Sequence, residues 1–137
     1  MYITRREYFN AAHKIANPEW DEAKNQEVFG GCANPNWHGH NYVLYVTVKG
    51  NINKETGFVV NLKKLSGVMR KHIIEKVDHK NFNLDVPFLK DILPSAENIA
   101  VAFWNELEKP VSDLGCKLHS LRLHETENNY VEYFGEK

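Results

Sequence analysis

The most regular alternation of hydrophobic and polar residues lies between residues 38 and 49. Side chains of a strand point alternately to its two faces, so residues two apart share a face. The more apolar face contains His38, His40, Tyr42, Leu44, Val46 and Val48. The pattern predicts a β-strand with one buried face, and it places both histidines on that face near the start of the strand.

Four other segments contain aromatic and β-branched residues that favour strands: residues 2–13, 58–60, 117–126 and 130–134. Asn128 and Asn129, between the last two segments, tolerate left-handed backbone, which indicates a hairpin. Residues 17–37 are polar and contain turn-forming residues, so a long excursion is expected there. Long excursions in compact domains are often functional.

Two segments show the three- and four-residue spacing of apolar positions that is typical of amphipathic helices. The first follows Asn61, a suitable N-cap, and extends to Val77. The second follows Ser95, and Pro110 is expected to end it. Residues 78–87 are expected to form a loop. Strands at both ends of the chain around two helices predict an α+β fold, in which an antiparallel sheet carries both helices on one face.

The composition excludes several classes of protein. With 137 residues and a mass of 15.9 kDa, the chain is expected to form a single domain over residues 1–137. Its mean hydropathy of -0.52, without an apolar run near about 20 residues, excludes a transmembrane helix. A net charge of -1 disfavours a nucleic-acid-binding protein. Because no secretory signal is visible, Cys32 and Cys116 are expected to be free thiols of a cytoplasmic protein.

Histidine spacing gives the first indication of chemistry, in the segment His38-Gly39-His40. Imidazoles two residues apart on a strand point the same way and could bind one Zn²⁺ ion. His13, at the end of the first predicted strand, is the natural third ligand if that strand pairs nearby. Three histidines would leave a fourth position open, as in catalytic zinc sites. The His-x-His motif alone is short and common, so histidines with solvent or core partners are the alternative.

Three further features could take part in chemistry. Cys32 precedes His38 by six residues, and a thiol near a dication can lose its proton near neutral pH and act as a base. The alternative is a small buried core residue. Asp78 could fix the tautomer of His79 if a turn brings their side chains together, or both could be solvated. Glu125 ends an apolar strand face, where it could accept two hydrogen bonds from a heterocycle or lie exposed at the rim.

The order of these features resembles the 6-pyruvoyltetrahydropterin synthase family, which includes the 6-carboxytetrahydropterin synthases of queuosine biosynthesis. The similarity covers essentially the whole chain, through His13, residues 32–42 (CANPNWHGHNY), residues 78–87 (DHKNFNLDVP) and residues 125–129 (ETENN). Each motif alone is weak, whereas the ordered set is specific. The resemblance implies the tunnelling fold, or T-fold, in which a four-stranded antiparallel sheet carries two helices. It also implies homohexamers of two stacked trimers, with active sites at subunit interfaces.

The resemblance implies a role for each candidate residue. These residues are His13, His38 and His40 as zinc ligands, Cys32 as general base, Asp78 and His79 as proton relay, and Glu125, Ser95 and Glu97 as pterin-binding residues. Two departures from the family pattern concern the pocket. Trp37 stands where the animal enzymes usually have glycine, which would narrow the entrance. Ala96 follows Ser95 where those enzymes commonly have a hydroxyl pair, so one pocket hydrogen bond is in question.

The implied reaction is the conversion of 7,8-dihydroneopterin triphosphate to 6-pyruvoyltetrahydropterin with elimination of triphosphate, by a zinc-dependent lyase. The alternative product within the family is 6-carboxytetrahydropterin, released with acetaldehyde. The five-residue gap between Cys32 and His38 looks more like the pyruvoyl-forming enzymes. Alternatives of another class are a non-catalytic protein that binds zinc and a pterin, and a zinc hydrolase; neither gives Cys32 a role. The implied redox change is internal to the substrate, and the chain has no G-x-G-x-x-G or P-loop motif.

Overall fold

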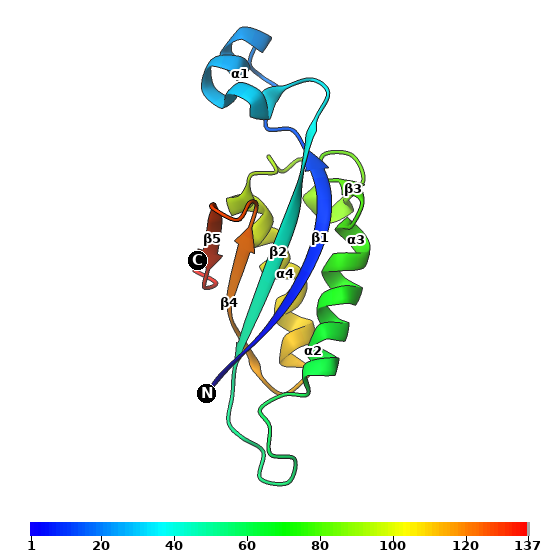
Figure 1. The fold of residues 1–137 in the computed structure, drawn as a ribbon, viewed down its shortest axis with the longest axis vertical. Helices are drawn as coiled ribbons and strands as arrows, with labels where there is room; N and C mark the ends of the chain where they lie inside the picture. The colour runs from blue at the N-terminus through cyan, green and yellow to red at the C-terminus, as the bar shows by residue number, and fades with distance from the viewer. Residues whose placement is uncertain (137) are drawn as a thin grey trace.

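A computed structural model describes residues 1–136. The strands are β1 (Tyr2–His13), β2 (His38–Lys49), β3 (Lys80–Asn81), β4 (Lys117–His124) and β5 (Tyr130–Tyr133). The helices are α1 (Glu22–Phe29), α2 (Leu62–Met69), α3 (Glu75–Val77) and α4 (Ala96–Ser112). A π-helical turn, η2 (Arg70–Ile74), joins α2 to α3, and 3₁₀ turns occur at η1 (Gly30–Ala33) and η3 (Pro87–Leu89). Figure 1 shows how these elements are arranged.

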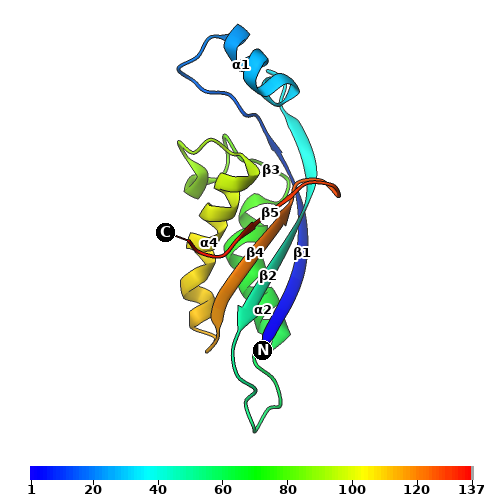
Figure 2. The ribbon, with the colours of Figure 1, turned by 90° about the vertical axis from the view of Figure 1, so that its left-hand side faces the viewer.

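One sheet with the strand order β3-β1-β2-β4-β5 forms the centre of the fold. β1 and β2 are antiparallel along their whole length, from Tyr2 opposite Lys49 to His13 opposite His38. β4 pairs antiparallel with β2, and β5 completes the predicted hairpin. Figure 2 shows α2 and α4 on the same side of this sheet. The predicted α+β arrangement is therefore confirmed.

The sheet has one strand more than the four expected, because β3 joins the edge of β1 in parallel. This strand consists of two residues inside the segment expected to be a loop. The backbone N–H groups of His79 and Phe82 donate to the carbonyl oxygens of Asn10 and Ala12, at 2.7 and 2.9 Å. A free strand edge offers unpaired backbone groups to any adjacent segment, which explains pairing without a hydrophobic pattern.

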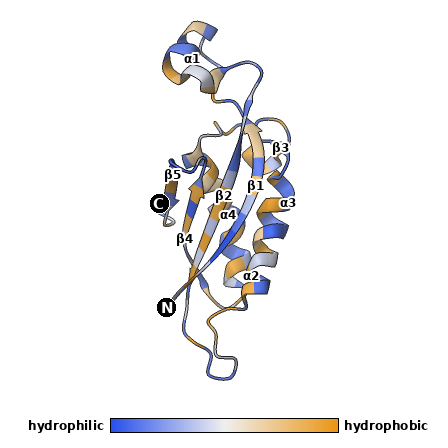
Figure 3. Cartoon of the chain, in the orientation of Figure 1, coloured by the Kyte–Doolittle hydropathy of each residue, from blue (hydrophilic) through white to orange (hydrophobic). Residues whose placement is uncertain are grey.

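The sheet packs on the helices through alternate residues of its strands. Leu44, Val46 and Val48 of β2 are fully buried, as are Leu65 of α2 and Phe103 of α4. Figure 3 shows hydrophobic positions alternating with hydrophilic ones along β4. The helix expected after Asn61 is present, and the side chain of Asn61 accepts hydrogen bonds from the next turn as predicted. Within residues 1–136, no helix is long and apolar enough to cross a membrane.

One predicted strand is absent from the described residues, and the predicted end of one helix is wrong. Residues 58–60 form bends instead of a strand, because the loop pairs its own backbone groups: Asn53 N–H donates to the Phe58 carbonyl at 3.1 Å. Pro110 does not end the second helix, which continues to Ser112. Proline lacks a backbone N–H and so removes one hydrogen bond of the helix. The helix continues past it because Val111 packs in the core and Asp113 N–H donates to the Lys109 carbonyl at 3.0 Å.

The polar excursion contains a helix that the sequence did not predict. Helix α1 projects beyond the ends of β1 and β2 (Figure 1). It has no buried apolar stripe: its buried residue is Asn25, whereas Val28 is 54% exposed. The side chain of Asp21 caps the helix by accepting a hydrogen bond from Lys24 N–H at 2.8 Å. Capping and side-chain hydrogen bonds hold this helix, and hydrophobic periodicity cannot reveal them.

Candidate active site

Three histidines meet where β1 ends and β2 begins. His13 lies directly opposite His38 in the strand register, and His40 lies two residues further along β2. The ring centroids are 4.4 Å apart for His13 and His38, 5.1 Å for His13 and His40, and 5.0 Å for His38 and His40. One possible ligand atom from each residue lies within 4.8 Å of the others. The structure thus brings together the three residues predicted as zinc ligands.

Each of these histidines has a buried ring nitrogen without a hydrogen-bond partner among residues 1–136. The atoms are His13 Nε2, His38 Nδ1 and His40 Nε2. Buried polar atoms normally have partners, so unpaired ones require an explanation. A metal ion bound between the three lone pairs would satisfy all of them. Three imidazole donors with an open fourth position are the ligand set of catalytic zinc sites, so the residues present fit a zinc ion.

The ring of His13 is held in the orientation that a ligand needs. Its Nδ1–H donates to the Pro94 carbonyl oxygen at 2.8 Å, so Nε2 carries the lone pair. His13 is fully buried, and burial lowers its pKa to about 4. Burial also lowers the pKa of His38, as does the neighbouring His40. Both rings are therefore neutral near pH 7, which is the form that binds a metal. Pro94 could not be predicted from sequence, because its contribution is a backbone carbonyl.

Cys32 lies in η1, beside the end of β1. Its carbonyl oxygen accepts a hydrogen bond from Ile15 N–H at 2.7 Å, which fixes the loop against the two residues after His13. The side chain is half-buried, and the sulfur is a free thiol, as expected. Burial raises the pKa of Tyr42, and the nearby carboxylate of Glu125 raises it further.

The three residues predicted to bind a pterin line one cavity of about 290 Å³: Ser95, Glu97 and Glu125. Ile15 is also part of its lining, so the cavity adjoins the segment held by Cys32. Glu125 Oε1 is 3.6 Å from His40 Nε2, which places the carboxylate between the cavity and the histidine cluster. The hydroxyl of Ser95 accepts a hydrogen bond from Asn98 N–H at 3.2 Å and caps α4. The cavity lining contains two carboxylates, which suit a ligand rich in N–H donors.

Asp78 and His79 form the predicted pair. His79 Nδ1 is 3.1 Å from Asp78 Oδ1, and the same oxygen accepts a hydrogen bond from Asn10 N–H at 3.0 Å. The required turn comes from His79, whose φ is 59°. The His79 side chain is 77% exposed and lines a hollow of about 500 Å³ with Asn10, Asn41 and Lys80. Within residues 1–136, no hydrogen bond or ion pair joins this pair to Cys32 or to the histidine cluster.

The family model of 6-pyruvoyl tetrahydropterin synthase matches residues 2–136. This chain belongs to that family of enzymes. A 6-pyruvoyl tetrahydrobiopterin synthase from Homo sapiens is 42% identical over 134 residues, covering 98% of this chain and 91% of that protein. A 6-carboxy-5,6,7,8-tetrahydropterin synthase from Rickettsia typhi is 30% identical over 145 residues, covering 94% and 96%. The family resemblance read from the sequence is thus confirmed.

A solved structure of 6-pyruvoyl tetrahydropterin synthase from Caenorhabditis elegans superposes with a TM-score of 0.91. The two chains are 34% identical, and the match covers 99% of this chain and 96% of that one. The predicted T-fold of the family is therefore confirmed.

Proposed function

We propose that this chain is a zinc-dependent lyase that converts 7,8-dihydroneopterin triphosphate to 6-pyruvoyltetrahydropterin. The main support is the cluster of three buried histidine nitrogens without partners, next to a cavity lined by Glu125. The names and identities of the relatives favour the same reaction. The pyruvoyl-forming relative from Homo sapiens is 42% identical and the carboxy-forming relative from Rickettsia typhi is 30% identical, which favours the pyruvoyl product.

In this proposal His13, His38 and His40 hold the zinc ion, which supplies Lewis acidity to the hydroxylated side chain of the substrate. Glu125 accepts hydrogen bonds from N–H groups of the pterin ring and so orients the ring in the cavity. Ser95 and Glu97 complete the lining of that cavity.

The proton transfers fall to side chains of the protein. The Cys32 thiolate takes a proton from a carbon of the substrate side chain. The pair of Asp78 and His79 supplies or relays a proton, because the carboxylate stabilises the charged imidazole. The ring is protonated and the C–O bond to triphosphate breaks, so oxidation of the side chain is balanced by reduction of the ring. No external electron carrier is required.

We propose further that the active enzyme is a homohexamer in which a neighbouring subunit supplies Asp78 and His79. Within residues 1–136 no hydrogen bond or ion pair joins this pair to Cys32, which supports a pair supplied by a neighbouring subunit. Co-expression of Cys32→Ala with His79→Ala tests it, because mixed oligomers would contain some sites with both residues intact. We expect each variant alone to be inactive and the mixed oligomer to regain activity. Mixed oligomers that stay inactive would contradict a shared site.

The first experiment is a product assay on protein with a measured zinc content. Incubation with 7,8-dihydroneopterin triphosphate, without reductants, should release triphosphate and a 6-pyruvoyl pterin detectable by mass spectrometry. Release of 6-carboxytetrahydropterin and acetaldehyde would keep the lyase but assign the second product. No turnover by zinc-loaded protein would refute the reaction and favour a binding protein.

Cys32→Ala tests the base, with Cys116→Ala as the matched control. Loss of a general base typically costs about 100-fold or more in rate. We therefore expect Cys32→Ala to lose at least about 100-fold in turnover while it retains zinc, and Cys116→Ala to retain both. A Cys32→Ala variant with the wild-type rate would contradict the assignment and favour chemistry that does not use the thiol.

A further inference from the structure

Lys14 and Trp37 form a cation–π pair next to the zinc-ligand histidines in the chain. Lys14 directly follows His13, and Trp37 directly precedes His38. His13 and His38 are the last pair of the β1–β2 register, so Lys14 and Trp37 lie directly outside its end. The Lys14 ammonium lies 5.5 Å from the centroid of the Trp37 ring. The pair is thus one step beyond the proposed metal ligands.

The backbone on both sides of this pair is fixed. Lys14 N–H donates to Asn83 Oδ1 at 3.0 Å, and Asn83 Nδ2 donates to the Lys14 carbonyl at 2.9 Å. Trp37 N–H donates to the Asn34 carbonyl at 3.3 Å. Trp37 has a φ of 67°, in the left-handed region that bulky residues rarely adopt. Such strain concentrates at ligand-binding sites, and glycine would avoid it. The strained tryptophan therefore requires a reason beyond local folding.

Charge separates the two ends of the candidate site. The cavity lined by Glu97 and Glu125 suits the N–H groups of a pterin ring but repels a triphosphate. Lys14 makes no ion pair with a carboxylate among residues 1–136, so its ammonium is available to an anion. Cation–π contact with Trp37 restricts the long lysine side chain and lowers the entropy lost when it binds a ligand.

We propose that Lys14 binds the triphosphate group of the substrate and that Trp37 is the positioning residue that holds its ammonium beside the histidine cluster. This inference rests on the proposed function, since it names the protein group that receives the anionic part of the same substrate. The pterin ring would lie against Glu125, the hydroxylated side chain at the histidine cluster, and the triphosphate towards Lys14.

Binding measurements in the Cys32→Ala background test this assignment without turnover. The two ligands are 7,8-dihydroneopterin triphosphate and 7,8-dihydroneopterin, followed through pterin fluorescence on zinc-loaded protein. A charge-assisted hydrogen bond lost from a phosphate corresponds to roughly 10- to 100-fold in affinity. We expect Lys14→Met to weaken binding of the triphosphate by about this factor and to leave dihydroneopterin binding unchanged. Lys14→Arg should restore most of the lost affinity.

Lys24 provides a matched control, because its ammonium lies 4.3 Å from the centroid of the Trp20 ring in the same polar excursion. Lys24→Met should bind both ligands like the parent protein. Lys80→Met tests the competing cation in the hollow beside His79. The proposal is overturned if Lys14→Met binds the triphosphate normally, or if either control loses as much affinity as Lys14→Met does.

Trp37 variants separate positioning from folding. Trp37→Gly removes the ring and the strain, so it should fold at least as well as the parent while binding the triphosphate about 2- to 5-fold more weakly. Dihydroneopterin binding and zinc content should not change. An equal loss for both ligands would show a general effect on the pocket and overturn the positioning role. If the parent protein binds neither ligand, the proposed function itself fails, which is distinguishable from an insensitive Lys14→Met variant.

Discussion

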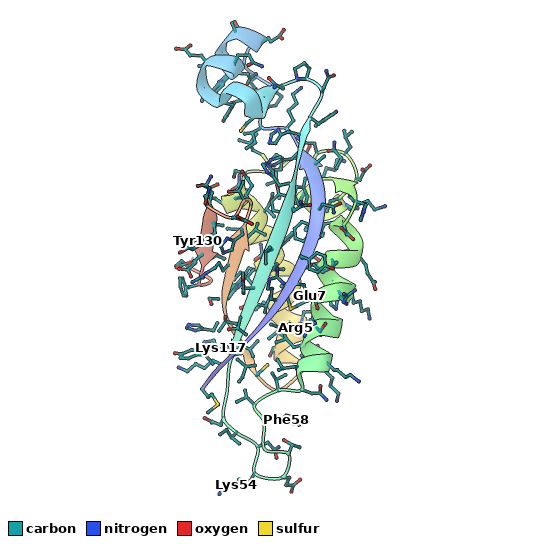
Figure 4. The ribbon with its side chains drawn as sticks, viewed as in Figure 1. Arg5, Glu7, Lys54, Phe58, Lys117 and Tyr130 are labelled. Carbon is teal, nitrogen blue, oxygen red and sulfur yellow. The ribbon has the colours of Figure 1, made fainter. Side chains whose placement is uncertain are left out.

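Glu7 is a buried carboxylate on the inner face of β1, and its neutralisation should destabilise the fold. Its side chain is 5% exposed and contacts Arg5 at 3.1 Å and Arg70 at 3.5 Å. It also accepts a hydrogen bond from Ser66 Oγ at 2.5 Å. Figure 4 shows Arg5 and Glu7 on β1 beside the α2 helix. These contacts tie the strand that ends in His13 to the helical layer.

The magnitude follows from the exposure of the partners. Arg5 and Arg70 are 42% and 58% exposed, so water screens both ion pairs and rehydrates either cation when its partner is lost. Glu7→Gln keeps the shape of the side chain and an acceptor for Ser66, and it avoids the desolvation of a carboxylate. We expect a loss of about 1 kcal/mol in the free energy of unfolding for Glu7→Gln. Glu7→Ala also leaves Ser66 without its acceptor, so it should lose about 2–3 kcal/mol.

Urea unfolding at a fixed protein concentration measures these changes. The control is Glu132→Gln, since Glu132 pairs with Arg122 at 2.7 Å but both side chains are exposed. The ion pair of Glu132 is shorter than those of Glu7, yet the burial of Glu7 should make its contacts contribute more to the free energy of unfolding. Glu7→Met provides an apolar side chain of similar length and should be less stable than wild type. The reasoning is refuted if Glu132→Gln is the more destabilising change, or if Glu7→Met equals wild type.

Three further outcomes follow from the structure. Burial raises the pKa of the Cys116 thiol above its ordinary value of 9.0, so at high pH the native state keeps a proton that the unfolded state loses. The free energy of unfolding, measured with urea, should therefore fall as the pH rises above 9.0. This fall should be smaller in Cys116→Ala. Phe82→Ala should lower the free energy of unfolding by about 3–5 kcal/mol, because the ring is 1% exposed. It should also weaken zinc binding in a metal-competition assay, since the ring centroid lies 6.3 Å from that of His13. Phe82→Leu is the milder control in both assays. A free zinc concentration near 1,000 Kd should stabilise the protein by about 4 kcal/mol, so removal of the metal by a chelator should lower the melting temperature. The melting temperature of His38→Ala should not change with the chelator.

Much of the histidine site was predictable because it depends on period-two alternation. His38 and His40 share a face in any straight strand, and His13 ends the adjacent segment of similar length. What the sequence could not fix was the register, which sets His13 opposite His38. A slip of one residue would place His13 on the other face, so the apolar positions of both strands select this register indirectly.

The parts that escaped prediction depend on backbone atoms or on polar side chains. The Pro94 carbonyl orients His13, but no side chain marks it. Strand β3 forms by backbone pairing along two residues. Helix α1 is stabilised by Asn25, whose side chain accepts from Asn17 N–H at 2.7 Å and donates to the Asn17 carbonyl at 3.1 Å. Such contacts leave no hydrophobic period in the sequence, so pattern analysis describes the region only as polar.

The histidine cluster continues the same inward face that builds the core. Phe9 and Tyr42 stack with centroids 5.0 Å apart; His40 occupies the next inward position of β2, and His13 follows Ala11 on the inward face of β1. An apolar pair at this end would add stability, whereas buried nitrogens without partners each cost about 1–3 kcal/mol. The cluster therefore weakens the fold unless a metal ion satisfies it, and binding of that ion must return the lost stability. Folding and metal binding are then linked, because the histidines stand on the inward face of β1 and β2 at positions where other residues of that face build the core.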